Sequence, residues 1–238
     1  MTHSPPPSAA ALPGVLGETF PHGRVETRTT LAAAAAVRTF AVGQTIIPQG
    51  DESQLALVLD GYIAVRRTTV DGRQLMVRIV TRGKLASIFP LAGRPAAGDS
   101  VALTPGAAAV WRGDEVRSLA TADAGLAVDI LDQVLGSFED VVTRLDGLIY
   151  QDALRRVARV LHFRGDLFFA ESPVLKRTHL PTLVGTSREM SGRVLRILES
   201  RGLVARVGRD RLRLLDPAGL ATLAESSVDR SRPSRGAG

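Results

Sequence analysis

The chain of 238 residues has no cysteine, only two lysines and no long apolar run. Without cysteine it cannot form disulfides, thiolate zinc sites or cysteine-ligated iron–sulfur clusters. No apolar stretch approaches the roughly 18 residues of a membrane-spanning helix, and the alanine-rich start lacks the basic and apolar regions of a secretory signal. We therefore expect a cytoplasmic protein with no membrane partner.

Sequence motifs of catalysis are also missing. The chain contains no GxSxG, HExxH or P-loop motif and no paired spacing of metal ligands. Its few histidines have no sequence partners that would complete a catalytic triad. We therefore predict that the protein is not an enzyme and holds no metal.

The positive charge is concentrated in the C-terminal part of the chain. Residues 151–238 hold 17 Lys+Arg against 9 Asp+Glu, giving +8, whereas residues 1–150 hold 13 against 15, giving −2. A GC-rich coding sequence would explain why arginine outnumbers lysine, but it would not explain this asymmetry. The asymmetry predicts that the C-terminal part meets the phosphate backbone of a nucleic acid.

The most informative stretch is TSREMSGRVLRILESRG, residues 186–202, which reads as an amphipathic helix. At about 100° per residue, core-type side chains fall on one side and polar or small residues fall within an arc of roughly 140°. That arc contains Arg188, Glu189, Gly192, Arg193 and Arg196. Thr186, followed three residues later by Glu189, predicts a capping box at the start of the helix.

A shorter helix is predicted just upstream, over HLPTLVG (179–185), with Pro181 in its first turn and Gly185 closing it. Two helices joined by a short glycine turn form a helix-turn-helix, whose second helix enters the DNA major groove. Downstream, LVARVGRDRLRLLD predicts a hairpin around residues 208–210. This hairpin would form a wing with arginines for DNA phosphates.

The N-terminal half has a different pattern, with short strands punctuated by glycine over residues 40–112. Val70-Asp71-Gly72 predicts a hairpin turn between two of them. Regularly spaced short strands are typical of a β-sandwich or barrel. The Pro- and Ala-rich residues 1–19 are predicted to form a disordered arm, and residues 226–238 a disordered tail.

Between the two halves, residues 126–149 have the period of a helix. Apolar residues recur at alternating spacings of four and three, the a and d positions of a heptad repeat. They are Leu131, Leu135, Phe138, Val142, Leu145 and Ile149. Such a stripe can pack on its own domain or on a second chain, and we favour a homodimer because helix-turn-helix proteins use two-fold symmetry on DNA. Asp152 is expected to cap the following helix.

Taken in order, these features resemble the Crp/Fnr family of bacterial transcription regulators over roughly residues 31–220. The sharpest likeness is VGTSREMSGRVLRILE (184–199), which is close to the family signature VGxSRExxxRxLxxLE. FAVGQTIIPQGD and LDGYIAV are similar to the family's entry strands, and YQDALRRVARVL to its hinge segment, with Asp152 at the hinge.

The resemblance implies an α+β fold of three parts. A cyclic-nucleotide-binding-like β-barrel (a double-stranded β-helix, or jelly roll) would occupy residues 20–125. The dimerisation helix and hinge would occupy residues 126–151, and a C-terminal winged helix-turn-helix residues 152–225. The implied partners are double-stranded DNA, a second copy of the chain and RNA polymerase.

The resemblance also assigns DNA contacts. The Arg, Glu and Arg of the signature, here Arg188, Glu189 and Arg193, would touch base edges of an inverted repeat with TGTGA-like half-sites. Arginine can pair with guanine O6 and N7, and glutamate can accept from cytosine N4. Alternatively, Glu189 only completes the capping box and the two arginines are merely solvated. The predicted phosphate contacts are Thr186, Ser187, Arg196, Arg206, Arg209 and Arg211.

The sensory half resembles the family in architecture but lacks its ligand chemistry. Cyclic AMP binders carry a Gly-Glu pair in a phosphate cassette, followed by Arg-Ser/Thr-Ala. Here GKLASIFPLAGRPAAGDSVAL (83–103) places Ile88 at the glutamate and Ala96 or Ala97 near the arginine. Because burying a phosphate without a cation is costly, we expect no cyclic AMP and no other cofactor. A candidate pocket, filled by its own side chains or by a nonpolar ligand, would be bounded by Ile88, Phe89, Arg94, Val141 and Val142.

Three alternatives remain open. An effector-gated regulator would use Arg94, the only nearby cation, in an altered cassette for a cyclic nucleotide or another small ligand. A scaffold protein would dimerise through the heptad helix and bind DNA only nonspecifically. A haem sensor would need an axial ligand, but the histidines lie in or beside the N-terminal arm or in the DNA-binding half; they are His3, His22, His162 and His179.

Overall fold

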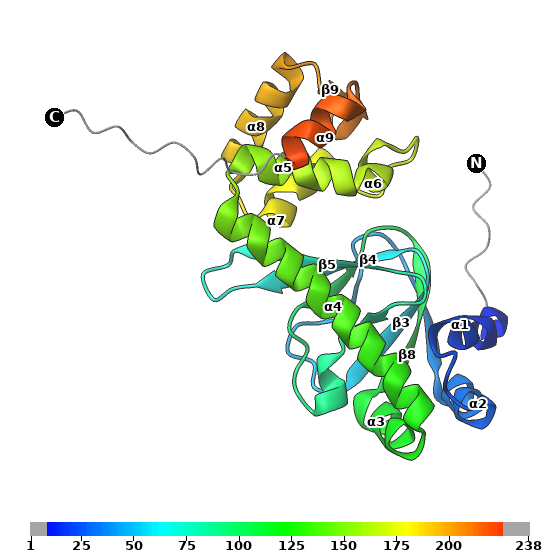
Figure 1. Cartoon of the computed structure of the whole chain (residues 1–238). Helices are drawn as coiled ribbons and strands as arrows, with labels where there is room; N and C mark the ends of the chain where they lie inside the picture. The colour runs from blue at the N-terminus through cyan, green and yellow to red at the C-terminus, as the bar shows by residue number, and fades with distance from the viewer. Residues whose placement is uncertain (1–8, 226–238) are drawn as a thin grey trace. The chain divides into compact units, whose positions relative to one another are not determined.

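The computed structural model describes residues 9–225, with the side chains of residues 9, 143, 144 and 146–150 excepted. The chain divides into two compact units, Met1–Val141 and Val142–Gly238. Helix α4 (Ala124–Tyr150) runs from the first unit into the second (Figure 1). None of the described helices has both the length and the apolar character needed to span a membrane.

The first unit is built on two four-stranded antiparallel sheets, which confirms the predicted jelly-roll-type β domain. One sheet has the order β1 (Ala36–Phe40), β8 (Gly106–Arg112), β3 (Gln54–Asp60) and β6 (Leu85–Ala86). The other has the order β2 (Thr45–Ile47), β7 (Asp99–Ala102), β4 (Tyr62–Thr68) and β5 (Gln74–Thr81). The predicted hairpin at Val70-Asp71-Gly72 joins β4 to β5, with Gly72 at a left-handed φ of 76°.

The central strands β3 and β8 are buried on both faces. On β3, Leu55, Leu57 and Leu59 belong to one core cluster, while Ala56 and Val58 belong to another. The cluster with the three leucines also contains helical residues such as Leu31 and Leu126, and we call it the outer cluster. The cluster with Ala56 and Val58 contains strand residues of both sheets, and we call it the inner cluster. A strand covered on both sides reads as a continuous apolar run, as QLALVLD does.

The structure differs from the predicted disordered arm. Residues from 9 onward form η1 (Ala9–Ala11) and α1 (Leu12–Thr19), followed by α2 (Val25–Ala34). The buried apolar side chains of this segment belong to the outer cluster: Leu12, Val15, Leu16, Phe20 and Leu31. The spacing of the first three is that of a helix face, and the proline near the start of α1 is tolerated in a first turn. Residues 1–8 and the predicted tail, 226–238, lie outside the described residues.

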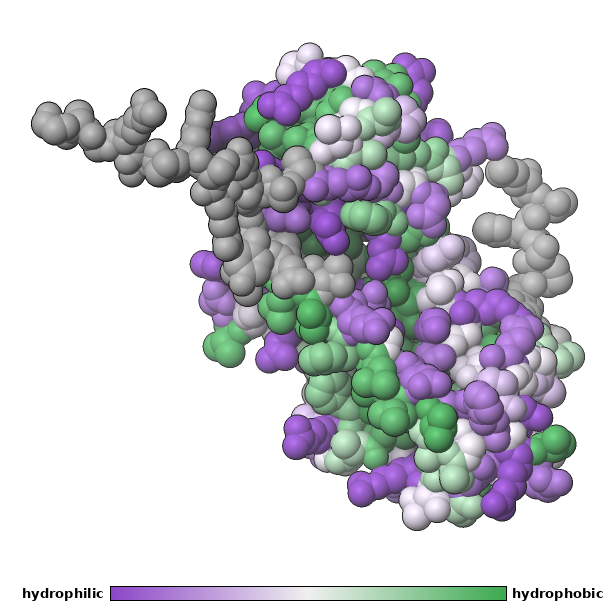
Figure 2. Space-filling model, viewed as in Figure 1, coloured by the Kyte–Doolittle hydropathy of each residue, from purple (hydrophilic) through white to green (hydrophobic). Residues whose placement is uncertain are grey.

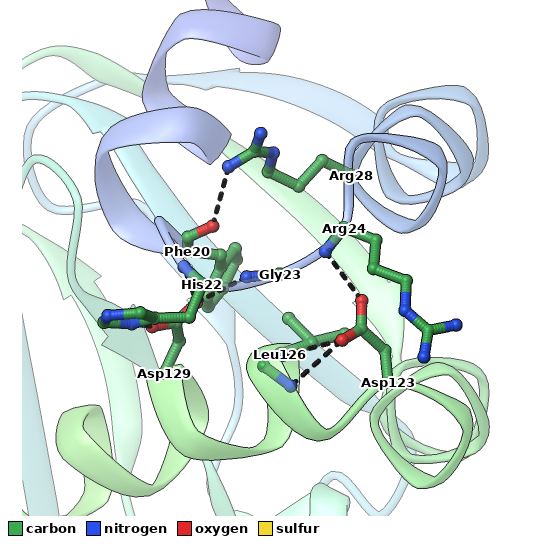
Figure 3. A network of polar contacts seen from close by, with 9 residues as sticks. Phe20, His22, Gly23, Arg24, Arg28, Asp123, Leu126 and Asp129 are labelled. Carbon is green, nitrogen blue, oxygen red and sulfur yellow. Dashed lines mark hydrogen bonds and ion pairs between the residues drawn. The ribbon is translucent and has the colours of Figure 1, made fainter.

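Two buried carboxylates hold this N-terminal segment to the start of α4 (Figure 3). Asp129 accepts hydrogen bonds from the backbone N–H groups of His22, at 3.0 Å, and Gly23, at 3.1 Å. The Nδ1 of His22 lies 2.7 Å from Asp129 Oδ1. Close packing reinforces this contact, because a Cβ on Gly125 would lie 1.9 Å from the carbonyl oxygen of His22. Any residue with a side chain at position 125 would therefore collide with the backbone of His22.

Asp123 is the second of these carboxylates, and its pKa is lowered from 3.8 to about 2. The hydrogen bond from the Thr27 side chain is the main cause, followed by the bond from the Arg24 backbone N–H. Because the pKa is lower in the folded state than in the unfolded state, the ionised group stabilises the fold fully above pH 3.8. This stabilisation is lost as the pH falls towards about 2.

We expect Asp123→Asn to remove this part of the acid sensitivity, so that its urea-unfolding free energy changes less with pH over that window than the free energy of wild type. The matched control is Glu52→Gln, at an exposed carboxylate. If both variants followed the wild-type curve, the assignment of acid sensitivity to Asp123 would be wrong.

Further helices complete the two units. The first unit also contains η2 (Phe89–Ala92) and α3 (Gly113–Ala122). The second contains α5 (Ala153–Phe163), α6 (Gly165–Phe169), η3 (Arg177–His179), α7 (Leu180–Val184), α8 (Arg188–Ser200), β9 (Val204–Val207), β10 (Arg211–Leu214) and α9 (Pro217–Glu225). Helix α5 contacts α7, α8 and α9, so it forms the centre of this unit.

Candidate nucleic-acid interface

The predicted pair of helices with a glycine turn is present as α7 and α8. Gly185 ends α7 in the left-handed conformation, with φ 63°, and its N–H donates to the carbonyl of Pro181. Thr186 N–H donates to the same carbonyl at 3.0 Å. These bonds occupy the end of α7 and redirect the chain into α8 within three residues.

The cap of α8 is one residue later than the sequence predicts. Ser187 is the N-cap, and its Oγ accepts a hydrogen bond from the N–H of Met190 at 3.1 Å. The capping box between Thr186 and Glu189 is therefore wrong, because the extended backbone of a cap residue occurs at Ser187, with ψ 159°. Glu189 lies in the first helical turn, where the helix dipole favours a negative charge.

Helix α8 divides into a buried side and an exposed side, as the sequence predicts. The buried residues are Ser191, Val194, Leu195 and Leu198. The predicted base-contact residues, Arg188, Glu189 and Arg193, are exposed, and so is the predicted phosphate contact Arg196. The exposed side thus presents three guanidinium groups and one carboxylate from a helix whose other side is fixed by the core.

Arg193 and Glu189 pair with one another across one helical turn, at 3.1 Å. Both side chains are well exposed, so the pair contributes only about 0.3–0.5 kcal/mol. Breaking it costs little, and either group can turn to a base edge that offers a better partner.

The wing forms as predicted, from β9 and β10 with Gly208 at a left-handed φ of 60° in the turn. Its arginines differ in their contacts. Arg206 Nε and Nη2 lie 2.7 Å and 2.6 Å from the two carboxylate oxygens of Glu199. This pairing lowers the pKa of Glu199 and raises the pKa of Arg206. Arg211 Nη2 donates to the carbonyl of Glu171 at 2.9 Å.

Arg206 and Arg211 therefore hold the wing on the domain, whereas Arg209 is exposed next to the glycine turn. The backbone carbonyl of Arg209 accepts a hydrogen bond from Arg177 Nε at 2.9 Å, which fixes the turn. The sequence interpretation missed Glu199. The available signal was an acidic residue near the end of the predicted helix, a few residues before an arginine-rich strand.

The predicted cap residue Asp152 and the heptad stripe lie where the sequence places them. Asp152 caps α5 by accepting from the N–H of Arg155 at 2.9 Å, as predicted. The apolar residues of the stripe are exposed in the single chain: Leu131, Leu135, Phe138, Val142 and Leu145. Figure 2 shows apolar side chains gathered over α4. The side chain of Ile149 lies outside the described residues.

The candidate ligand residues are found in different surroundings. Ile88 and Leu91 pack against the outer cluster. Phe89 and Val142 are exposed, Val141 is half-buried, and Arg94 is exposed beyond the end of η2. Ala96, near the position of the family arginine, is buried in the inner cluster. Neither Ile88 nor Ala96 can supply a hydrogen bond or charge to a phosphate.

Two family models match the chain: the cyclic nucleotide-binding domain over residues 37–123 and the Crp-like helix-turn-helix domain over residues 155–223. No curated protein is similar enough to be matched. Among solved structures, CLP of Xanthomonas campestris, described as a c-di-GMP-responsive global regulator, has 23% identity and a TM-score of 0.70 over 81% of this chain and 100% of that one.

Two further structures have the same fold. TTHB099, a CRP-family transcriptional regulator of Thermus thermophilus, has 23% identity and a TM-score of 0.68 over 81% of this chain and 98% of that one. FixK2 of Bradyrhizobium japonicum has 17% identity and a TM-score of 0.67 over the same shares. At these identities the structures establish the fold, and the two family models establish the order of the two domains.

Proposed function

Because the chain belongs to the Crp/Fnr family of transcription regulators and has its helix-turn-helix DNA-binding domain, we propose that it binds an inverted repeat as a homodimer, without cyclic AMP. The observation that carries this proposal is the exposed array of Arg188, Glu189 and Arg193 at the capped start of α8. A recognition helix reads bases with its N-terminal residues. Guanine and cytosine edges, as in TGTGA-like half-sites, match these side chains.

The two-fold symmetry would come from α4. Its stripe of leucine, valine and phenylalanine is exposed in the single chain, and a second copy has the complementary surface by symmetry. The two recognition helices would then meet half-sites one helical turn apart. The wing would contribute phosphate contacts, chiefly through the exposed Arg209.

Independence from cyclic AMP is supported by the residues at the cassette. Ile88 and Ala96 are packed in the two core clusters, and Arg94 is exposed. An anionic phosphate placed among these side chains would lose its hydration without gaining a partner. The dimer would therefore bind DNA in its unliganded state.

The test is a fluorescence-anisotropy titration of ligand-stripped protein onto a TGTGA inverted-repeat duplex and a scrambled duplex, with and without millimolar cyclic AMP. We expect selective binding that cyclic AMP does not change. Selectivity that arises only with cyclic AMP would favour the effector-gated alternative and make Arg94→Ala the next variant. Equal binding to both duplexes would contradict the predicted half-site.

A further inference from the structure

The carboxylate of Glu199, near the end of α8, makes three contacts with one residue of the wing. Its Oε1 accepts hydrogen bonds from the backbone N–H of Arg206, at 3.0 Å, and from Arg206 Nε, at 2.7 Å. Its Oε2 lies 2.6 Å from Arg206 Nη2. A carboxylate that meets two nitrogens of a guanidinium forms the strongest kind of charged hydrogen bond, and the backbone bond adds a third attachment. Strand β9 is thus bound to α8.

The other attachments of the wing are of a different kind. Arg177 Nε donates to the carbonyl of Arg209 at 2.9 Å, and Arg211 Nη2 donates to the carbonyl of Glu171 at 2.9 Å. Both bonds join the wing to the segment that precedes α7, and both have an uncharged backbone group as the acceptor. Glu199 differs in two ways, because it joins the wing to the helix that carries the base-contact residues and because it carries a negative charge.

That charge determines what Arg206 can offer to DNA. The side chains of Arg206 and Glu199 are 44% and 21% exposed, so water screens their attraction only in part. The hydrogen bonds from Arg206 lower the pKa of Glu199, and the carboxylate stays ionised at neutral pH. The pair is therefore neutral as a whole. A DNA phosphate would have to displace a carboxylate that already occupies two of the guanidinium nitrogens.

We propose that Glu199 is a positioning residue for DNA recognition, which fixes β9 on α8 and withholds the Arg206 cation from the DNA backbone. A phosphate contact carries no sequence information, so a released Arg206 would strengthen binding to any duplex. A fixed wing, in contrast, meets the backbone in the one register that the base contacts of α8 require. Glu199 therefore favours specific over nonspecific binding. This inference rests on the proposed function and deepens it.

The experiment measures binding of Glu199→Gln to the scrambled duplex by anisotropy at several salt concentrations. The amide can still accept a hydrogen bond, so the wing keeps its fold, whereas the charge that holds the guanidinium is gone. We expect roughly 3- to 30-fold tighter binding than wild type at about 0.1 M salt. The salt dependence should become steeper by about one unit for each released arginine, hence by about two for a dimer.

The matched control for charge is Glu171→Gln, at an exposed carboxylate whose residue contacts the wing through its backbone carbonyl. It removes the same charge without releasing Arg206, and screening should limit its effect to less than about 2-fold. Equal gains in the two variants, or a wild-type salt dependence in Glu199→Gln, would overturn the proposal. Weaker binding to both duplexes, as expected of a wing that no longer folds, would overturn it as well.

The double variant Glu199→Gln/Arg206→Met isolates the positioning effect, because it removes the attachment and keeps the net charge of wild type. Its affinity for the scrambled duplex should return to the wild-type value. Its affinity for the inverted repeat should fall about 2- to 10-fold, because a loose wing must be ordered when it binds in the specific register. Wild-type discrimination between the duplexes would mean that Glu199 does not position the wing.

Heparin chromatography of the same proteins tests the release of Arg206 without DNA. We expect Glu199→Gln to elute at higher salt than wild type, and the double variant to elute with wild type. If wild type bound the two duplexes equally, the predicted half-site would be wrong, but the gain on the scrambled duplex would still be measured. If wild type bound neither duplex, the proposed function would fail, and identical elution of all four proteins would be needed to overturn the release of Arg206.

Discussion

Arg188→Ala is expected to weaken binding to the inverted-repeat duplex by about 2–6 kcal/mol while barely changing binding to a scrambled duplex. A bidentate arginine–guanine contact is worth about 1–3 kcal/mol of discrimination, and a dimer makes it once in each half-site. The corresponding loss of affinity is roughly 30-fold to 10⁴-fold. Because Arg188 is exposed in the first turn of a helix whose cap belongs to Ser187, its removal leaves the fold in place.

The matched control for this prediction is Arg209→Ala on the wing. A phosphate contact carries no sequence information, so this variant is expected to weaken binding to both duplexes alike and to reduce the salt dependence by about one unit per contact. Anisotropy titrations at several salt concentrations measure both effects. Equal losses from the two variants on the two duplexes would favour a scaffold protein that binds DNA nonspecifically.

The helix-turn-helix could be predicted from the sequence because its signals are local. Gly185 ends one helix, the polar and apolar residues after it alternate with the helical period, and Asp152 has the side chain that a cap requires. Each of these follows from a few neighbouring residues. The capping box was wrong by one residue because the backbone conformation of the turn, which favours Ser187, is not determined by side-chain types alone.

The N-terminal segment was misread for a different reason. Its proline and alanine content suggested disorder, although Leu12, Val15 and Leu16 have the spacing of a buried helix face. Burial of these residues needs the sheet and α4, which are brought to them only by the fold, through contacts such as Gly23 with Asp129. Composition alone therefore did not predict the helix and the buried side chains that this segment has in the folded chain.

The buried arginine of the β domain shows the same limit. Arg78 lies between apolar residues in the strand sequence QLMVRIVT, and the sequence interpretation gave it no role. Its surroundings depend on the register that aligns it with Val65 and Ser100 and on its pairing with Asp140, which lies far along the chain. A charged residue at an inward position of an alternating strand was the one available signal.

Phe138→Glu is expected to convert the dimer to a monomer and to lower affinity for the inverted repeat roughly 10²- to 10⁴-fold. Phe138 is 63% exposed in the single chain, so the substitution leaves the monomer fold intact and acts on the interface alone. In a two-fold dimer the change removes two aromatic side chains and brings two carboxylates into an apolar seam. The DNA affinity falls because two half-sites are then bound independently, without the gain from linkage.

Sedimentation velocity measures the change in mass, and circular dichroism checks that the helices remain. Glu139→Ala is the matched control, since this exposed neighbour lies off the apolar stripe and should leave the dimer unchanged. Leu135→Glu should repeat the effect of Phe138→Glu one helical turn earlier. A dimer that survives both stripe substitutions would mean that α4 does not form the interface, and the second chain would have to be held by another surface.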